Sequence, residues 1–435
     1  MSTTAHSSAA VPETLRRDAV APGHHEYDAL RSTYSTVGAP ALILRPRSVG
    51  DVVDAIELAR KDPRPLAVRS GGHGPASTND GGIVVDVSRL DDVTVLDPGR
   101  RLVRVGAGAR WAGVARELAP AGWAISSGDH GNVGVGGLAT GGGVGWLTRS
   151  YGLTIDHARA ATVVLADGSV VAADEDHEAE LFWGLRGAGG SLGVVTSFDF
   201  VAAPVREVGI TRLRIQVDPD GFALSHWGAV MASAPRDLTS FVTVMPSREG
   251  WVAEIAAVVS GRTHLTRELT APLTGIGRVL DARSEITTYA ALLPEGHLHA
   301  NVGQQPAVAA NGLAEELTPE LAGRVMAALR DLGGAAVQLR SLGGAVHDIA
   351  RSAMAFSHRH QHVMVVLAAF PPTDINELDR VWADIEPETE GSYLNFDSRP
   401  HTARAVARAF PGAVGTRLRR LQKTVDPDGV FLPSQ

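Results

Sequence analysis

Apolar residues follow two different spacings in the first part of the chain. Ser48 and Asp51 have the spacing of a capping box, which predicts the start of a helix. The apolar residues that follow fall on one helical face: Val52, Val53, Ile56 and Ala59. Short apolar runs predict strands at 66–69, 83–87, 93–96 and 102–105, and an amphipathic run predicts a helix at 111–118. Asp167-Gly168 predicts a tight hairpin between strands at 162–165 and 170–172.

After about Val205 the glycine clusters thin out and alternating runs predict strands at 210–217, 241–245 and 252–258. Helical spacing returns at 318–332 and again at 416–423. This change predicts an α+β protein with two domains. We expect a disordered tail over 1–26, a first domain over 27–204, a second over 205–393, and a return to the first domain over 394–435.

The composition excludes several kinds of protein. The 435 residues include no cysteine, which excludes disulfides, thiol nucleophiles and cysteine-ligated metals. The formal charge of -8 argues against nucleic-acid binding. The chain contains no run of about 18 apolar residues, so no membrane-spanning helix is expected. The first residues lack the apolar core of a signal peptide. We therefore expect a cytoplasmic protein without nucleic-acid or membrane partners.

A glycine-rich loop directly follows the strand expected at 66–69. It reads Arg69-Ser70-Gly71-Gly72-His73-Gly74. Consecutive glycines allow successive backbone N–H groups to point at one anion, and an arginine adds a charge-assisted hydrogen bond. The loop therefore suits a phosphate group. The alternative is a tight turn that carries a surface histidine.

A second segment, 128–145, holds nine glycines in eighteen positions. This density indicates close approach of the backbone to a flat ligand or a diphosphate. A flexible linker is the alternative, but interleaved Val133, Val135 and Leu138 fit it poorly. A third segment, 181–196, places glycines before a β-branched strand. A Rossmann dinucleotide fingerprint begins at Gly106-Ala107-Gly108 but is incomplete, because Trp111 stands where its third glycine belongs.

In this order the three segments resemble the FAD-linked oxidases of the vanillyl-alcohol oxidase superfamily, most closely the berberine-bridge-enzyme-like branch. The matching family patterns are R-S-G-G-H, G-x-C-x-x-V-G-x-G-G and L-F-W-x-L-R-G-x-G-G. Phe356 to Arg359 and Tyr393-x-Asn395 are supporting matches. The resemblance implies a two-part PCMH-type FAD-binding domain and a substrate domain with an antiparallel sheet backed by helices. The residues that it implies in FAD binding are Arg69, Ser70, Gly71, Gly72, His73, Gly74, Gly128, His130, Val133, Gly134, Gly136, Gly137, Gly193, Val194, Val195, Asn395 and Phe396.

The resemblance also implies that His73 is bonded covalently to the 8α-methyl group of the flavin. Many relatives carry a cysteine that forms a second flavin bond, and His130 occupies that position here. We therefore expect a single linkage, not a bicovalent one. His130 would then pack beside the flavin or contact the substrate, with a second histidyl bond as the alternative. Val133 stands where relatives carry the residue thought to control access of O2, which favours an oxidase.

Three residues are candidates for proton transfer or substrate contact: Tyr393, His130 and His358. The family pattern Tyr-x-Asn-Tyr ends here in Phe396, which has no hydroxyl group. On a strand, His358, His360 and His362 would share one face. A metal site is one interpretation of that face, but the expected chemistry needs no metal, so we predict none.

We expect an oxidase that removes hydride from a C–H bond next to OH or N of a small aromatic, alkaloid-like or polyketide-type molecule. Its partners are this substrate and O2, which would be reduced to H2O2. The first alternative is a flavin-dependent cyclase or isomerase without net oxidation, which the Phe396 substitution motivates. The others are a sugar (oligosaccharide) oxidase and a non-catalytic flavin-binding protein.

Overall fold

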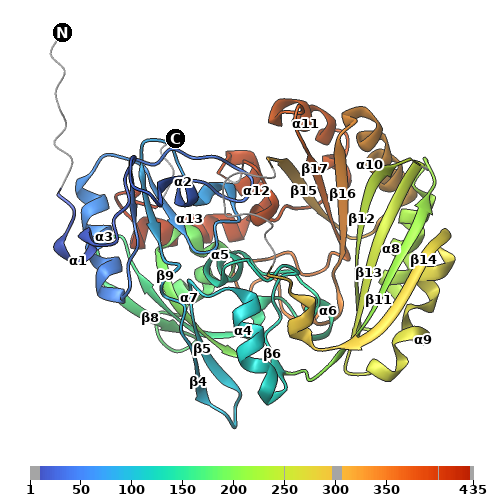
Figure 1. Ribbon diagram of the computed structural model, residues 1–435, viewed down its shortest axis with the longest axis horizontal. Helices are drawn as coiled ribbons and strands as arrows, with labels where there is room; N and C mark the ends of the chain where they lie inside the picture. Colours follow the sequence, from blue (N-terminus) through green and yellow to red (C-terminus); the bar gives the residue numbers. More distant parts are fainter. Residues whose placement is uncertain (1–9, 249, 296–305, 400, 432–435) are drawn as a thin grey trace.

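The computed structural model describes residues 10–248, 250–295, 306–399 and 401–431, and these form two lobes (Figure 1). The first lobe contains three sheets. A parallel sheet has the order β1 (Leu42–Leu44), β3 (Ile83–Asp86), β2 (Leu66–Arg69). An antiparallel sheet has the order β4 (Val93–Asp97), β5 (Leu102–Gly106), β9 (Val194–Val201), β7 (Ala158–Val164), β8 (Val170–Asp174). The third pairs β10 (Ala203–Pro204) with β6 (Trp123–Ala124).

Nine α-helices belong to the described part of the first lobe. They are α1 (Glu13–Arg16), α2 (Tyr27–Leu30), α3 (Val49–Lys61), α4 (Trp111–Leu118), α5 (Val135–Gly141), α6 (Thr148–Tyr151), α7 (Ala179–Ala188), α12 (Ala403–Ala409) and α13 (Ala413–Val425). The last two come from the end of the chain. α13 packs against α7, and its Gln422 donates a hydrogen bond to Ser191 in the turn that follows α7.

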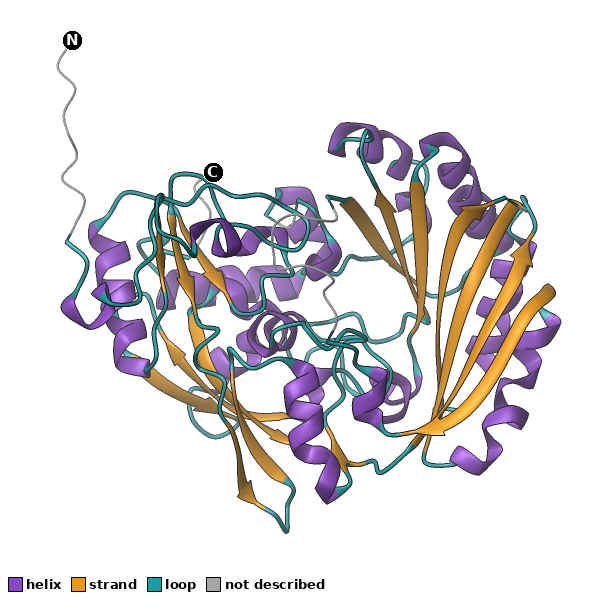
Figure 2. Ribbon diagram, viewed as in Figure 1, coloured by secondary structure: helices purple, strands orange, loops and turns teal. Residues whose placement is uncertain are grey.

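The second lobe is one seven-stranded antiparallel sheet with helices on a single face (Figure 2). Its order is β14 (Arg278–Thr287), β11 (Val208–Val217), β13 (Gly250–Ser260), β12 (Leu238–Ser247), β16 (Ala335–Ser341), β17 (Val363–Ala369), β15 (Val308–Ala314). The helices are α8 (Phe222–Ser233), α9 (Thr266–Thr270), α10 (Pro319–Leu332) and α11 (Ile375–Trp382). The predicted α+β fold, with an antiparallel sheet backed by helices, is therefore confirmed.

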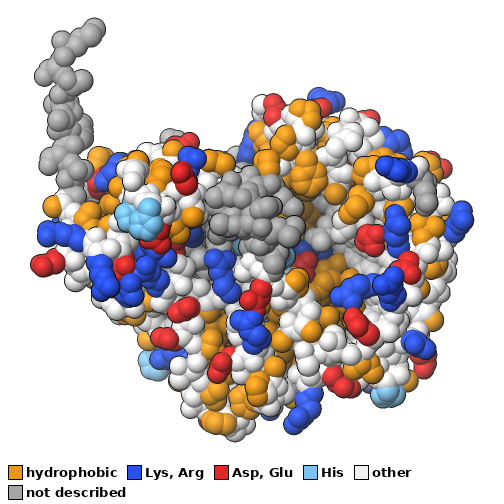
Figure 3. All heavy atoms as spheres, viewed as in Figure 1, with side chains coloured by type: hydrophobic (Ala, Val, Ile, Leu, Met, Phe, Trp, Pro, Cys, Tyr) orange, Lys and Arg blue, Asp and Glu red, His pale blue; other side chains and the backbone are white. Residues whose placement is uncertain are grey.

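Side-chain alternation along this sheet sends residues into two different cores. Val242 and Val244 of β12 pack with the helices, whereas Phe241 joins the core of the first lobe. On the face drawn in Figure 3, hydrophobic side chains are visible where the two lobes meet. The helix-free face of the sheet is therefore the one directed at the first lobe.

Several local predictions are confirmed. Ser48 and Asp51 form the capping box that starts α3, and Thr318 caps α10. β2 and α4 begin and end where the sequence predicted them. β7 and β8 form the predicted hairpin, with Gly168 in its turn at a φ of 86°.

The disordered tail predicted for 1–26 is wrong for residues 10–26; residues 1–9 lie outside the described part of the chain. Leu15 of α1 is buried against α3, and Val20 forms backbone hydrogen bonds with Ile43 in both directions. These two apolar side chains give the segment enough burial to order it. None of the helices in the described ranges combines the length and apolar character that crossing a membrane requires.

Candidate cofactor and active site

The first two glycine-rich segments are in direct backbone contact. A Cβ atom at Gly71 would clash with the backbone of Gly134, and one at Gly134 would clash with Gly71 and with Ser70 Oγ. Arg110 bridges the two segments, because its Nη1 donates to the carbonyl of Gly71 at 2.7 Å and also to that of Asn132. Ser70 Oγ donates to the carbonyl of Ala107 at 2.6 Å. Glycine is therefore required on both sides of this contact.

His73 lies between two other rings. Tyr34 stacks on it with ring centroids 5.3 Å apart and an interplanar angle of 8°. The His130 ring is 5.6 Å away at 54°. The structure thus brings together His73 and His130, which the sequence placed on separate segments. Tyr34 was missed, because no motif marks it.

The surroundings of His130 keep its imidazole neutral near pH 7. Partial burial lowers the pKa of His130, and the neighbouring Asp129 carboxylate only partly opposes this. Its Nδ1 accepts a hydrogen bond from the backbone N–H of Asn132 at 3.3 Å. In the neutral ring the proton therefore resides on Nε2.

Tyr393 and Asn395 are hydrogen-bonded to the backbone of the second glycine segment. The Tyr393 hydroxyl accepts hydrogen bonds from the backbone N–H of Gly143 at 2.9 Å and from Asn395 Nδ2 at 3.0 Å. Asn395 Nδ2 also donates to the carbonyl of Gly137 at 3.1 Å. Burial raises the pKa of Tyr393, so the phenol stays protonated and is a poor base.

A buried arginine that sequence reasoning missed lies next to this group. The guanidinium of Arg340, on β16, is 4.7 Å from the ring centroids of both Phe241 and Phe396. Its Nη2 pairs with Asp129 Oδ2 at 2.8 Å. Trp146 stacks on Phe241 at 4.5 Å. Sequence reasoning missed Arg340 because no element was predicted there and because its partner lies in the distant second glycine segment.

The histidine-rich segment is not a strand, because β17 begins only at Val363. His358 is buried, its Nε2 contacts the carbonyl of Ala409 at 3.0 Å, and burial lowers its pKa to about 4. His360 pairs with Glu390, and His362 lies against His347 with ring centroids 4.7 Å apart. The three histidines therefore share no face, and His358 packs beside α12 rather than beside His73.

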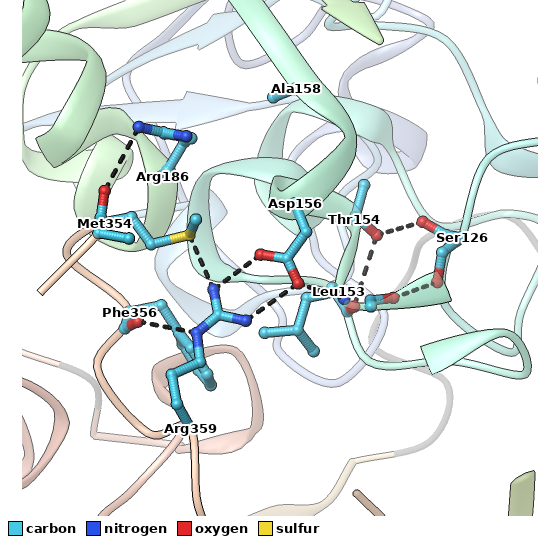
Figure 4. A network of polar contacts seen from close by, with 12 residues as sticks. Ser126, Leu153, Thr154, Asp156, Ala158, Arg186, Met354, Phe356 and Arg359 are labelled. Carbon is cyan, nitrogen blue, oxygen red and sulfur yellow. Dashed lines mark hydrogen bonds and ion pairs between the residues drawn. The ribbon is translucent and has the colours of Figure 1, made fainter. Parts of the chain in front are cut away.

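A buried ion pair anchors this segment to the first lobe. Arg359 Nη1 and Nη2 donate to the two Asp156 oxygens at 2.9 and 2.8 Å, and Nη2 also contacts Met354 Sδ (Figure 4). The side chains of Arg359 and Asp156 are 2% and 5% exposed. The pair fixes the chain around Phe356, whose ring meets that of Tyr393 edge-on at 6.1 Å.

Other residues predicted to bind the cofactor have a structural role as well. Gly193, at a φ of 155°, leaves space for Val163 and Val164 of the adjacent strand, and the side chains of Val194 and Val195 are buried in the core. Arg69 donates to the carbonyls of Leu30 and Ser77, so it braces the first loop from behind. The remaining positions are backbone of the two glycine segments: Gly72, Gly74, Gly128, Val133 and Gly136.

The site fits a flat cofactor that carries a diphosphate. A Cβ atom at Gly74, Gly137 or Gly190 would point into open space, so backbone from all three segments is accessible. The third segment joins the others because Gly189 packs on Thr140 of α5. The buried Nη2 of Arg69 has no hydrogen-bond partner among the described atoms. The guanidinium, whose Nη1 is also 3.8 Å from Asp86 Oδ2, is buried behind the loop expected to hold the diphosphate and places a positive charge there.

Comparisons with known proteins agree with this geometry. Residues 40–174 match a family model described as "FAD binding domain". The chain is 30% identical to (R)-6-hydroxynicotine oxidase of Paenarthrobacter nicotinovorans, over 98% of this chain and 97% of that protein. The solved structure of 6-hydroxy-D-nicotine oxidase from Arthrobacter nicotinovorans superposes with a TM-score of 0.85 at 24% identity, covering 97% of this chain and 98% of that one.

A sugar oxidase has a similar fold. Glucooligosaccharide oxidase from Acremonium strictum, whose structure is described as carrying 6-S-cysteinyl, 8α-N1-histidyl FAD, superposes with a TM-score of 0.83 at 22% identity. The match covers 95% of each chain. At this identity the match concerns the fold alone.

Proposed function

This chain belongs to the FAD-linked oxidoreductases of the vanillyl-alcohol oxidase superfamily, in the berberine-bridge-enzyme-like branch, and we propose that it oxidises a small aromatic, alkaloid-like or polyketide-type metabolite. Bound FAD would supply the hydride acceptor for a C–H bond next to N or OH, and O2 would reoxidise it with release of H2O2. The observation that carries the proposal is the convergence of the three glycine segments beside His73, Tyr393 and Asn395.

We propose that residues 27–204 and 394–435 hold FAD and that 205–393 bind the substrate. The apposed loops at Gly71 and Gly134 would receive the diphosphate on their backbone N–H groups, with Arg69 as the nearby cation. Asn395, which is exposed beside α5, is placed to hydrogen-bond the cofactor. The cytoplasm remains the proposed location.

The proposed attachment is a single bond between His73 and the flavin 8α-methyl group. Stacking on Tyr34 restricts the orientation of the His73 ring. Without cysteine in the chain, the second bond of bicovalent relatives is not available. His130 is then left neutral beside His73, where it contacts the flavin or the substrate.

Within the proposed reaction the structure favours C–N over C–OH oxidation. An alcohol must lose its hydroxyl proton as the hydride leaves, which calls for a base. Tyr393 is protonated and already accepts two hydrogen bonds, and Phe396 has no hydroxyl, so an alcohol oxidation would depend on the neutral imidazole of His130 as its base. A neutral amine needs no such base, because its own lone pair stabilises the cation that forms. This argument also weighs against a sugar oxidase.

A substrate screen tests the proposal. Candidate cyclic and secondary aromatic amines, their hydroxylated analogues and oligosaccharides are mixed anaerobically with the flavoprotein, and bleaching of the flavin band is followed. H2O2 is then measured in air. Rapid bleaching by amines with stoichiometric H2O2 supports the proposal. Turnover without H2O2 would favour the cyclase or isomerase, and no bleaching by any class would favour a non-catalytic flavoprotein.

A further inference from the structure

Segment 358–362 leaves a group of ligand-type side chains that the flavin chemistry does not use. Glu315, His360 and Glu390 each offer one ligand atom, and the three atoms lie within 4.8 Å of one another. His360 Nε2 is 2.7 Å from Glu390 Oε2. Two ligand atoms of a tetrahedral zinc ion are about 3.4 Å apart, since Zn–N and Zn–O bonds are about 2.0–2.2 Å long. The 2.7 Å separation is that of a hydrogen bond, and a shift of less than about 1 Å between the two side chains would give the separation that a metal ion requires.

Backbone hydrogen bonds hold the three contributing segments in place. Glu390 N–H donates to the Leu313 carbonyl at 2.8 Å, and Leu313 N–H donates to the Gly391 carbonyl at 3.1 Å. His362 N–H donates to the Ala314 carbonyl at 3.0 Å. Glu315, which directly follows β15, is thus flanked by the segments that carry the other two ligands. These hydrogen bonds therefore hold the three segments side by side.

A buried amide next to the three ligands has an unused oxygen. Gln361 is 1% exposed, and its Nε2 lies 2.9 Å from Glu390 Oε2 and 3.2 Å from His360 Nε2, so the amide is directed at the group. Its Oε1 has no hydrogen-bond partner among the described atoms. A buried carbonyl without a partner costs free energy. Rotation of the amide would present this oxygen to a cation held by the three ligands.

We propose that Glu315, His360 and Glu390 bind one divalent transition-metal ion of the zinc class, with Gln361 as a further oxygen donor. One imidazole and two carboxylates suit Zn²⁺, whereas Ca²⁺ requires six to eight oxygen ligands. The site differs from the sequence-based expectation of no metal and lies outside the flavin chemistry. A bound ion would tie segment 358–362 to the segment that leads into Tyr393.

The test is titration of the tag-free flavoprotein with ZnCl2 by isothermal calorimetry, with Co²⁺ absorption as a second readout. We expect binding of one ion, at least about tenfold tighter than in Glu315→Gln or His360→Asn. We also expect a rise in melting temperature with Zn²⁺ that these variants lack. Ca²⁺ should give neither effect. All three side chains are at least partly exposed, so the variants are expected to fold, and circular dichroism checks this.

Two matched variants separate this site from other histidines. His177 pairs with Asp174 at 3.0 Å on the surface. Among the described residues this pair has no third side chain that could complete a metal site, so His177→Asn should leave Zn²⁺ binding unchanged. His24, His25 and Glu26 form the other candidate group in the described ranges. Loss of binding in His24→Asn but not in His360→Asn would overturn the proposal. Absence of wild-type binding up to ~1 mM Zn²⁺ would overturn it as well.

Discussion

Removing the charge of Asp156 should destabilise the protein far more than removing the charge of an exposed carboxylate. Asp156→Asn keeps the size of the side chain but leaves the guanidinium of Arg359, 2% exposed, without its anion. An uncompensated buried charge of this kind costs about 3–5 kcal/mol. Asparagine still accepts one hydrogen bond from Arg359, so we expect the lower end, about 3 kcal/mol.

The chain offers a matched control for this change. Arg417 and Glu180 form an ion pair with the same two-pronged geometry, at 2.5 and 2.8 Å, but their side chains are 41% and 52% exposed. Water solvates the arginine that Glu180→Gln leaves behind, so we expect a loss of about 0–1 kcal/mol. Urea unfolding of the flavoprotein, followed by circular dichroism and by flavin fluorescence, measures both variants.

A double variant tests the physical reason. Asp156→Asn combined with Arg359→Met removes the stranded charge, so this protein should be more stable than Asp156→Asn alone. The reasoning is refuted if Asp156→Asn loses no more than Glu180→Gln. It is equally refuted if the loss in free energy of unfolding in the double variant equals the sum of the losses in the two single variants.

Four further changes have defined outcomes. Gly134→Ala should abolish FAD retention at unchanged secondary structure, because the new Cβ meets Gly71 and Ser70. Gly113→Ala, with open space around it, should retain FAD. The flavin absorbance per mole of protein measures retention in both variants. Val133→Ile should slow reoxidation by O2 in stopped-flow experiments, and an unchanged rate would reject its role in oxygen access. Burial lowers the pKa of His358 to about 4, so between about pH 6.5 and pH 4 its imidazole is protonated in the unfolded protein and neutral in the folded protein. Stability should therefore fall by about 3 kcal/mol as the pH decreases through that window, and His358→Gln should remove this part of the slope in urea titrations. Tyr393→Phe should leave the pH profile of flavin reduction by an amine unchanged, and loss of its alkaline limb would restore Tyr393 as a base.

What the sequence predicted well depends on short-range physics. The capping box at Ser48, the helix 111–118 and the turn at Gly168 are decided by residues a few positions apart. The glycine segments were also recognisable, because such a density of glycine destabilises regular elements and therefore indicates a need for close backbone approach.

What the sequence did not predict depends on contacts between distant segments. On a strand, His358, His360 and His362 would share one face, but β17 begins only at Val363, and Arg359 between them pairs with the distant Asp156. The partners Arg340 and Asp129 are likewise far apart in the chain, and no motif marks Arg340. Such pairs become visible only when the fold places them together.

The most direct test of the account is the site of flavin attachment. The purified protein is precipitated with acid, and the washed pellet is digested and mapped by mass spectrometry for a flavin-bearing peptide. We predict flavin on the peptide that contains His73, its loss in His73→Ala, and its persistence in His130→Ala. Free FAD in the supernatant of the wild-type protein, or flavin on the peptide that contains His130, would contradict the account.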